Sequence, residues 1–329
     1  MKIRNENDKI QHVLFTDIDE ELKKIRPGYA EYKEAYEKSF DFVNDTGSPL
    51  YIPFEVNDYC NMRCKMCWRS VTENPNGKRE NIDMNLLDKF IRECKEINMP
   101  SFFLGAQSEC LINPDIIEII RRIRETGGGI DDVLITNGYN LTDEICEALI
   151  EYQWEKLFIS LDAATPETYK KIRGRNLEKV ENNIEKLLKM KKEKNSKLPF
   201  IRVSFVVMEE NKHEMQAFIN KWKDKVDRID FQTYQPQAEA SNIVKLPETT
   251  KRCSDPFRKL EMDCYGNFYP CASIYKKYYC LGNIKDMSVE EAWNSEKIRK
   301  LREEMLSGNL SDVCKNCLRR TENYVEVEA

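Results

Sequence analysis

The chain has very little histidine and no long apolar run. His12 and His213 are the only histidines in 329 residues. Two histidines offer little for a histidine-rich metal site or for serine-type nucleophilic catalysis, so neither is expected. No segment approaches the ~20 apolar residues of a membrane-spanning helix, and the polar start MKIRNENDKI is unlike a secretory signal. We therefore expect a cytoplasmic protein with no membrane partner.

The chain also lacks a strong charge of one sign. Lys and Arg number 52 against 57 Asp and Glu, a net charge of −5. Nucleic-acid binding depends largely on a basic field, so no nucleic-acid partner is expected. Apolar residues make up 41% of the chain, which is enough for a core. The length suits one large domain and a smaller one.

Cysteine, by contrast, is abundant. Twelve cysteines without an export signal indicate metal ligation in a reducing cytoplasm rather than disulfides. Cys60, Cys64 and Cys67 lie within eight residues, directly after the apolar run Tyr51–Asn57. Three close thiols suit an iron–sulfur cluster better than zinc, which prefers four ligands. One iron would keep an open position for a small molecule, which indicates an enzyme. The alternatives are chance clustering or a zinc site with a distant fourth ligand.

Short apolar segments alternate with longer amphipathic ones from residue 51 to about 235. The expected strands are Tyr51–Asn57, Ser101–Gly105, Asp132–Thr136, Leu157–Asp162, Ile201–Met208 and Arg228–Tyr234. The expected helices are Asn85–Asn98, Pro114–Thr126, Thr142–Tyr152, Leu177–Lys194 and Asn211–Lys223, with Asp83, Asn113 and Thr142 as N-caps. Six β-α units in parallel order predict an α/β fold with ligands at the C-terminal ends of the strands. The pattern leaves an open sheet and an incomplete barrel equally possible.

The C-x3-C-x2-C spacing after a first strand resembles the signature of the radical S-adenosylmethionine (SAM) enzymes. In that family the three cysteines hold a 4Fe–4S cluster whose open iron binds the methionine part of SAM. An electron from a flavodoxin- or ferredoxin-type reductant then produces a 5′-deoxyadenosyl radical, which abstracts a substrate hydrogen. The resemblance covers roughly residues 51–235 and implies a six-stranded partial (β/α)6 TIM barrel there. Residues 1–50 are expected to form a helical extension, with helices at 21–26 and 29–42.

The segment after the second expected strand is also similar to the family's. Ala106, Gln107, Ser108 and Glu109 stand where the family has a glycine-glycine-glutamate segment that contacts the methionine amino group. The glycines are missing here, so an ordinary loop is the alternative.

Polar residues end the third and fourth expected strands: Thr136, Asn137, Ser160 and Asp162, with Arg173 following one short helix later. The resemblance implies that Ser160 and Arg173 bind the carboxylate or ribose of SAM, a role that suits the guanidinium fork. A structural Asp162–Arg173 pair is the alternative. Val207 is expected to pack against the adenine or in the core.

A second set of cysteines follows residue 236, where the β-α rhythm stops. After a connector at Pro236–Thr250, Cys253 lies 18 positions before Cys271, and the Cys314-x-x-Cys317 pair follows. This spacing is similar to the shortened SPASM domain, called Twitch, of radical SAM enzymes. It implies that these four cysteines hold a second 4Fe–4S cluster, giving two clusters in a cysteine-rich domain at 236–329. Zinc is the alternative at this site.

Five other cysteines have less specific surroundings. Cys94 and Cys146 lie on expected helices and suit packing. Cys110 is a candidate hydrogen-atom donor to a substrate radical, as cysteines are in related epimerases. Cys264 and Cys280 either border the second cluster or fill its apolar surroundings.

For the substrate we favour a sugar- or aminocyclitol-like small molecule that is dehydrogenated, epimerised or deoxygenated. No leader-peptide domain is visible, and hydroxyl-binding residues end the sixth expected strand: Gln232, Tyr234, Gln235 and Gln237. The first alternative is a peptide-modifying enzyme whose leader-binding partner is a separate chain. The second, of another class, is a non-enzymatic iron–sulfur carrier or zinc scaffold.

Overall fold

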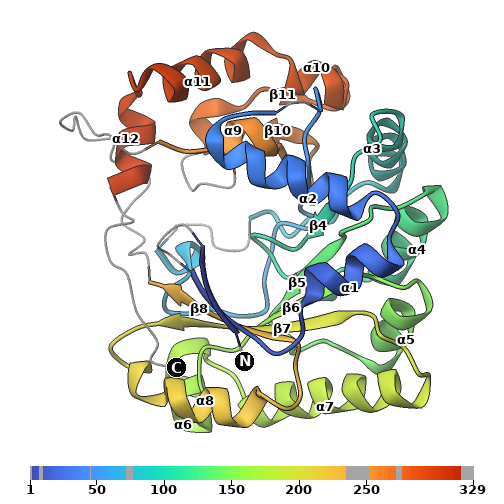
Figure 1. Cartoon of the computed structure of the whole chain (residues 1–329), viewed down its shortest axis with the longest axis vertical. Helices are drawn as coiled ribbons and strands as arrows, with labels where there is room; N and C mark the ends of the chain where they lie inside the picture. Colours follow the sequence, from blue (N-terminus) through green and yellow to red (C-terminus); the bar gives the residue numbers. More distant parts are fainter. Residues whose placement is uncertain are drawn as a thin grey trace.

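The central sheet carries the six parallel strands that the sequence predicts. The computed structural model describes residues 2–6, 10–44, 46–71, 77–234, 252–271 and 276–319. Its strands form one open sheet in the order β1-β2-β8-β7-β6-β5-β4-β3-β9-β10-β11 (Figure 1). Strands β3 to β8 are parallel and follow the chain order. This arrangement confirms an α/β fold built on a partial barrel.

The predicted elements recur with shifts of a few residues. The parallel strands are β3 (Ile52–Phe54), β4 (Phe102–Leu104), β5 (Val133–Thr136), β6 (Lys156–Ser160), β7 (Phe200–Val207) and β8 (Arg228–Thr233). The helices are α3 (Met84–Glu96), α4 (Ile116–Thr126), α5 (Asp143–Glu151), α6 (Pro166–Arg173), α7 (Leu177–Glu193) and α8 (Met215–Trp222). Asp83 and Thr142 cap α3 and α5 as expected. Asn113 was expected to cap α4, which is wrong: it closes the short helix η3 (Cys110–Ile112), and α4 starts after Asp115.

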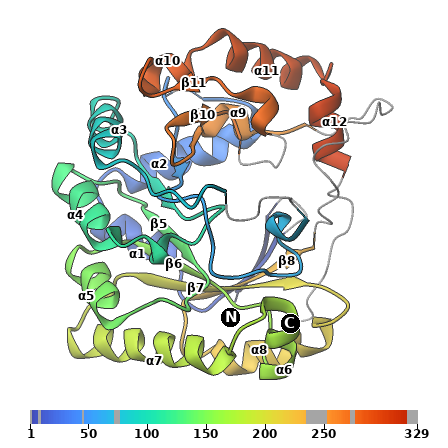
Figure 2. The same cartoon turned by 180° about the vertical axis from the view of Figure 1, so that it is seen from behind.

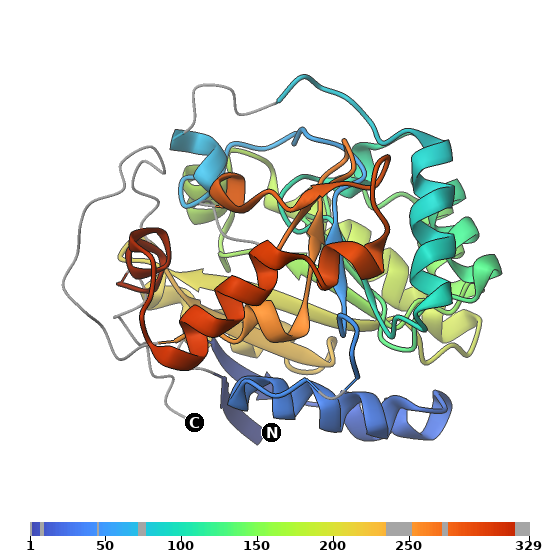
Figure 3. The same cartoon turned by 90° about the horizontal axis from the view of Figure 1, so that it is seen from above.

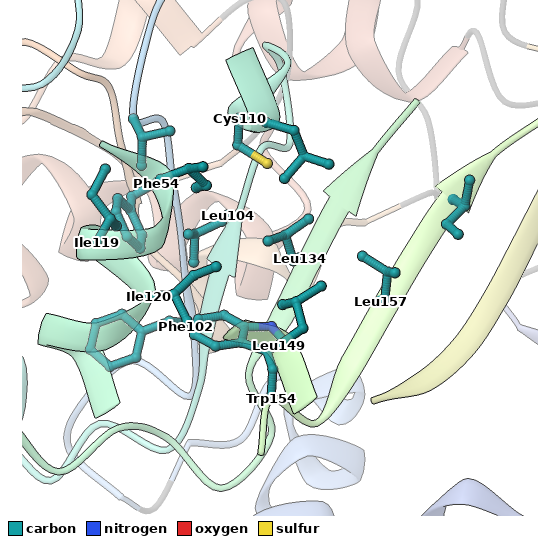
Figure 4. Close-up of a cluster of buried hydrophobic side chains, with 14 of the residues drawn as sticks. Phe54, Phe102, Leu104, Cys110, Ile119, Ile120, Leu134, Leu149, Trp154 and Leu157 are labelled. Carbon is teal, nitrogen blue, oxygen red and sulfur yellow. The ribbon is translucent and has the colours of Figure 1, made fainter. Parts of the chain in front are cut away.

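The main core lies between the sheet and the helices that cover its outer face. Leu134, Leu157 and Phe205 lie on three different strands, point to the outer face of the sheet and are fully buried. The apolar stripe predicted on α7 is buried as well, at Val180 and Ile184 among others. Figure 4 shows one part of this core, where strand side chains meet those of α4 and α5. Burying each large apolar side chain contributes about 1.5–3 kcal/mol.

The inner face of the sheet is more accessible than the outer one. Several side chains at the alternate strand positions are half-buried, although Lys156, Ser204 and Asp230 on the same face are buried. The half-buried ones are Phe103, Ile135, Phe158, Ser160, Arg202, Val206 and Gln232. Because neighbouring residues of a strand point to opposite faces, these side chains line the concave side of the partial barrel. The concave side therefore has room for contact with a ligand.

The N-terminal segment is only partly helical, so the expectation for residues 1–50 was incomplete. Helices α1 (Ile18–Ile25) and α2 (Tyr29–Lys38) are present, followed by η1 (Ser39–Asp41), but β1 (Lys2–Glu6) and β2 (Ile10–Leu14) form a hairpin. Strand β2 pairs antiparallel with β8, placing His12 opposite Asp230. The strand state of β2 is therefore supported by pairing with the edge of β8, an effect that local propensity does not reveal.

The C-terminal segment continues the sheet at its other edge. It comprises α9 (Asp255–Arg258), β9 (Glu261–Met262), β10 (Asn267–Tyr269), η5 (Lys276–Tyr279), β11 (Gly282–Asn283), α10 (Val289–Trp293), α11 (Glu296–Ser307) and α12 (Asp312–Arg319). Strand β9 pairs with both β3 and β10, and a turn at Gly266 joins β9 to β10. Helices α10 to α12 lie on the side of the sheet opposite α6 to α8 (Figures 1 and 2), and α11 crosses in front of the sheet in Figure 3.

Two sequence expectations fall outside the described residues. These are the connector Pro236–Thr250 and the hydroxyl-binding residues Gln235 and Gln237. Within the described part of the chain, no helix has the length and apolar character needed to cross a membrane.

Candidate functional site

The first cysteine set lies in the loop that leaves β3 at its C-terminal end. Cys64 is buried, while Cys60 and Cys67 are half-buried. The Met62 backbone N–H donates to Cys60 Sγ at 3.4 Å, and Arg173 Nη1 donates to Cys64 Sγ at 3.5 Å. Two of the three sulfurs therefore already accept hydrogen bonds of the kind that stabilises a thiolate.

The chemistry of this loop fits an iron–sulfur cluster. Burial raises the pKa of the Cys60 thiol to about 11 and also raises that of Cys64. A metal-free thiol there keeps its proton at neutral pH, whereas binding to iron replaces that proton with positive charge. In the described residues, no group of three or more Cys, His, Asp or Glu side chains is arranged so that it could hold a single metal ion.

The expected ligand segment at 106–109 is attached to the cysteine loop through Glu55. The Glu55 carboxylate accepts the backbone N–H groups of Gln107 and Ser108 at 2.7 and 2.9 Å, and the Ser108 hydroxyl as well. Arg69 donates to the Gln107 carbonyl at 2.7 Å. Ala106 is exposed, so the start of the segment remains accessible.

A glycine precedes this segment where the chain turns. Gly105 has φ +81°, and a Cβ there would lie 2.5 Å from the Ile135 carbonyl oxygen. A larger residue would clash with backbone and adopt a strained conformation. The segment lacks the family's paired glycines but begins from a position that requires one.

Glu109 is a buried carboxylate of the site. Its side chain is 2% exposed and accepts Thr136 Oγ1 at 2.6 Å, the Asn137 N–H at 2.7 Å and the Leu111 N–H at 3.2 Å. Burial outweighs these donors and raises the pKa of Glu109 to about 7. Asn137 also donates to Asn61 in the cysteine loop at 2.8 Å. Thr136 and Asn137 thus position Glu109 and the loop together.

Asp162 and Arg173 form an ion pair beside Cys64, which was the structural alternative for these residues. Asp162 is fully buried and Arg173 is 8% exposed. The hydroxyl of Tyr169, one turn earlier on α6, is buried with no hydrogen-bond partner within the described structure. Burial raises the pKa of this tyrosine. Ser160, half-buried at the end of β6, lies on the accessible inner face.

Two expected site residues lie in the core instead. Cys110 is fully buried, and its thiol donates to the Ile135 carbonyl at 3.4 Å (Figure 4). This enclosure favours packing over hydrogen donation to a substrate. Val207 also belongs to the main core, and Val206 is the half-buried neighbour on the inner face.

The sequence analysis missed Glu55 and Asn61. Glu55 is the only charged residue in the apolar run before the cysteines, and that contrast was the available signal. Asn61 bridges Asn137 and Asn140, both at 2.8 Å, which connects the cysteine loop to the end of β5. Nothing in the spacing of Asn61 indicates these contacts.

Most of the second cysteine set gathers around one small apolar cluster. Cys253 and Cys314 pack against Phe257 and Met305. Burial, with smaller contributions from the charges of Asp255 and Cys317, raises the pKa of Cys253 to about 12. Cys271 follows β10 and is half-buried. These thiols form a second donor set, separate from the first in sequence.

The remaining cysteines suit packing. Cys94, Cys146 and Cys264 are buried in the main core. Cys280 is half-buried near η5. No two of the twelve cysteines, all of which lie in described residues, form a disulfide.

Curated relatives share moderate identity with the chain. A "tungsten-containing aldehyde ferredoxin oxidoreductase cofactor-modifying protein" of Pyrococcus furiosus is 23% identical over 75% of this chain and 81% of its own length. GTP 3′,8-cyclase of Limosilactobacillus fermentum is 29% identical over 56% of this chain, which spans about half (54%) of that enzyme. The subtilosin biosynthesis protein AlbA of Bacillus subtilis is 24% identical over 78% of this chain and 62% of its own length.

Solved structures share the fold. BtrN in complex with AdoMet and 2-DOIA has a TM-score of 0.56 at 17% identity, covering 82% of this chain and 92% of its own. Streptococcus suis SuiB bound to precursor peptide SuiA has a TM-score of 0.59 at 13% identity, covering 83% and 70%.

Family comparisons decide the class. Residues 54–221, more than half of the chain, match the Radical SAM superfamily, and residues 253–318 match the SPASM iron–sulfur cluster-binding domain. The chain therefore belongs to the radical SAM superfamily, as an enzyme with a SPASM-type domain whose cofactors are SAM and 4Fe–4S clusters.

Proposed function

We propose that this enzyme uses SAM to abstract a hydrogen atom from a sugar- or aminocyclitol-like small molecule. Cys60, Cys64 and Cys67 would hold the cluster that binds SAM. When bound, the cluster and SAM supply a 5′-deoxyadenosyl radical. The observation that carries this proposal is the three-thiol loop at the end of β3, attached to Glu109 and Arg173 by hydrogen bonds.

The protein's own residues would hold the ligand and exclude water. Glu55 fixes the backbone of Gln107 and Ser108, the segment proposed to contact the methionine end of SAM. The half-buried Ser160 stands at the end of β6. A rigid surround of this kind favours a reactive geometry because little reorganisation is needed.

A polar inner face supports the small-molecule substrate. Ser160 and Gln232 are half-buried on that face, and Tyr234 follows β8. Such groups can bind hydroxyl and amino substituents. Dehydrogenation, epimerisation and deoxygenation all remain outcomes of the same hydrogen abstraction. BtrN, whose fold this chain shares, has been solved in complex with AdoMet and 2-DOIA.

For the second cluster we propose Cys253, Cys271, Cys314 and Cys317 as ligands. Three of these residues are in or near one apolar cluster, which would exclude water from the iron. Four protein ligands leave no open iron, so this cluster would conduct electrons rather than bind substrate. We propose a reducing cytoplasm as the location, where cysteines stay available as cluster ligands rather than forming disulfides.

A peptide substrate is the second candidate. Two relatives favour it, because SuiB has been solved with precursor peptide SuiA and AlbA is named for bacteriocin biosynthesis. The leader-binding partner would then be a separate chain. Membership of an enzyme family argues against the non-enzymatic carrier or zinc scaffold.

The test is anaerobic reconstitution followed by deuterium tracing. We expect about eight iron per chain and cleavage of SAM to 5′-deoxyadenosine, and about four iron without cleavage after Cys60, Cys64 and Cys67 are replaced by alanine. Deuterium from labelled aminosugars or cyclitols should appear in 5′-deoxyadenosine. Transfer from peptides alone would replace the small-molecule proposal, and cleavage by the triple variant would refute the cysteine assignment.

A further inference from the structure

Arg173 contacts two protein groups at the cysteine loop. Its Nη2 pairs with the buried Asp162, and its Nη1 lies 3.5 Å from Cys64 Sγ. Only 8% of the residue is exposed. The guanidinium is therefore directed at a carboxylate and at a cysteine sulfur in a buried setting.

The surrounding backbone fixes this arrangement from both sides. Asp162 has φ +65°, and its Oδ1 accepts the Val206 N–H at 2.7 Å. Arg173 ends α6, where Gly174 adopts the left-handed conformation of a C-cap. The Lys65 N–H donates to the Ile172 carbonyl at 2.9 Å, which attaches the cysteine loop to the same turn. The contact between Arg173 and the sulfur is thus held by three segments of chain.

We propose that Arg173, oriented by Asp162, sets the reduction potential of the N-terminal cluster by donating a hydrogen bond to the Cys64 sulfur. The proposal rests on the proposed function, in which Cys64 binds iron. Hydrogen bonds to cluster sulfurs and nearby positive charge stabilise the reduced, more electron-rich state. Burial strengthens the effect, because water screens the guanidinium poorly there. Arg173 acts through Cys64 and is a positioning residue.

The test compares midpoint potentials in redox titrations followed by electron paramagnetic resonance. The variant Asp162→Asn/Arg173→Met removes both charges together, so no buried carboxylate is left alone. Asparagine tolerates the positive φ and can still accept the Val206 N–H, and methionine keeps much of the arginine stem volume. We expect the N-terminal cluster to shift to a more negative potential while the second cluster in the same sample stays unchanged.

Two further variants make the result specific. Arg173→Lys keeps the charge but lacks the planar fork that reaches both partners, so its potential should also fall. Arg175→Gln is the matched control, because Arg175 is exposed and donates only to the Asn61 carbonyl of the same loop. Its potential should stay near that of the parent protein.

Three outcomes would overturn the proposal. The first is an unchanged potential in the Arg173 variants, with or without loss of SAM binding, and the second is an equal shift in Arg175→Gln. The third is loss of the N-terminal cluster from both Arg173 variants while the control loads normally, because Arg173 would then hold the cluster rather than tune it. Failure of the proposed function is separately visible, since the Cys60, Cys64 and Cys67 triple variant would then retain the N-terminal signal.

Discussion

At the residue scale, the site combines buried carboxylates with thiols that are protonated when metal-free. Glu109 accepts three hydrogen bonds, yet burial still raises its pKa to about 7. The Asp162 carboxylate instead forms an ion pair with the guanidinium of Arg173. Two carboxylates of one site therefore face different environments, one stabilised by neutral donors and the other by a full positive charge.

The raised pKa of Glu109 predicts a pH-dependent stability. The folded protein retains this proton between about pH 4.5 and 7, where the unfolded chain has released it, so stability falls as pH rises through that window. The contribution is about 3 kcal/mol. In denaturant unfolding of the reduced, metal-free protein, Glu109→Gln should lack this part of the decrease.

Thr136→Val is the companion variant. It removes the hydroxyl that donates to Glu109 at 2.6 Å, so the ionised form loses support and the fall in stability should extend to higher pH. Identical pH profiles for the parent and Glu109→Gln would contradict the assignment.

Sequence patterns located the cysteines and strand ends but not the contacts between them. The spacing of Cys60, Cys64 and Cys67 is local, so it is visible without a structure. The pairing of Glu55 with residues 107 and 108 crosses 52 positions or more, and no local pattern encodes it. The sequence analysis weighed two roles for Arg173, and its contacts with both Asp162 and Cys64 are visible only in the structure.

At the element scale, the parallel strands were predictable because their apolar runs are nearly continuous and buried on the outer face. The hairpin β1–β2 was not, because its two strands are short and β2 pairs with a strand more than 200 residues away, the edge of β8. Asn113 is a residue type that is common at N-caps, but it ends the short helix η3, and α4 begins later in the chain. Propensity thus failed where a tertiary contact or an extra turn intervened.

The cap of α3 gives a test on a single element. The Asp83 carboxylate accepts the N–H groups of Asn85 and Leu86 at 2.9 and 3.0 Å. Asp83→Ala should lower the free energy of unfolding by about 1 kcal/mol. Asp88→Ala on the same helix removes a solvent-exposed pair with Arg122 and should cost roughly 0.5 kcal/mol or less. Equal costs in thermal or denaturant unfolding would argue against the cap.

The junction between β2 and β8 depends on a buried carboxylate. Asp230 accepts His12 Nδ1 at 2.7 Å and pairs with Arg202 at 2.9 Å and with Arg228. These partners outweigh burial and lower the pKa of Asp230, so its contribution is present above the unfolded pKa and is lost in strong acid.

Asp230→Ala should destabilise the protein by about 3–5 kcal/mol, because it leaves two arginines beside an empty position. Hydrogen exchange at residues 10–14 should rise more than exchange in β5. A loss below roughly 1 kcal/mol, with exchange unchanged, would mean that the hairpin is held elsewhere.

At the scale of the whole molecule, charge is distributed unevenly. The chain carries a net charge of −5, yet residues 61–71 of the cysteine loop contain Arg63, Lys65 and Arg69 and no acidic residue. The exposed end of α6 adds Lys170, Lys171 and Arg175 beside this loop. Electron transfer to a half-buried cluster requires a donor close to its exposed edge. An acidic one-electron carrier of the flavodoxin or ferredoxin type would therefore be attracted to this face.

Charge reversal at this face tests the proposed carrier. Lys170→Glu/Lys171→Glu should slow reduction of the N-terminal cluster by an acidic flavodoxin roughly five- to tenfold at low salt, and added salt should shrink the difference. Reduction by a small neutral reductant should stay unchanged, since both lysines are exposed and lie outside the proposed ligand set. Lys189→Glu/Lys192→Glu on α7 changes the net charge equally, away from the loop. If stopped-flow traces show the same slowing for both double variants, net charge rather than a docking face controls the rate, and the carrier must approach from elsewhere.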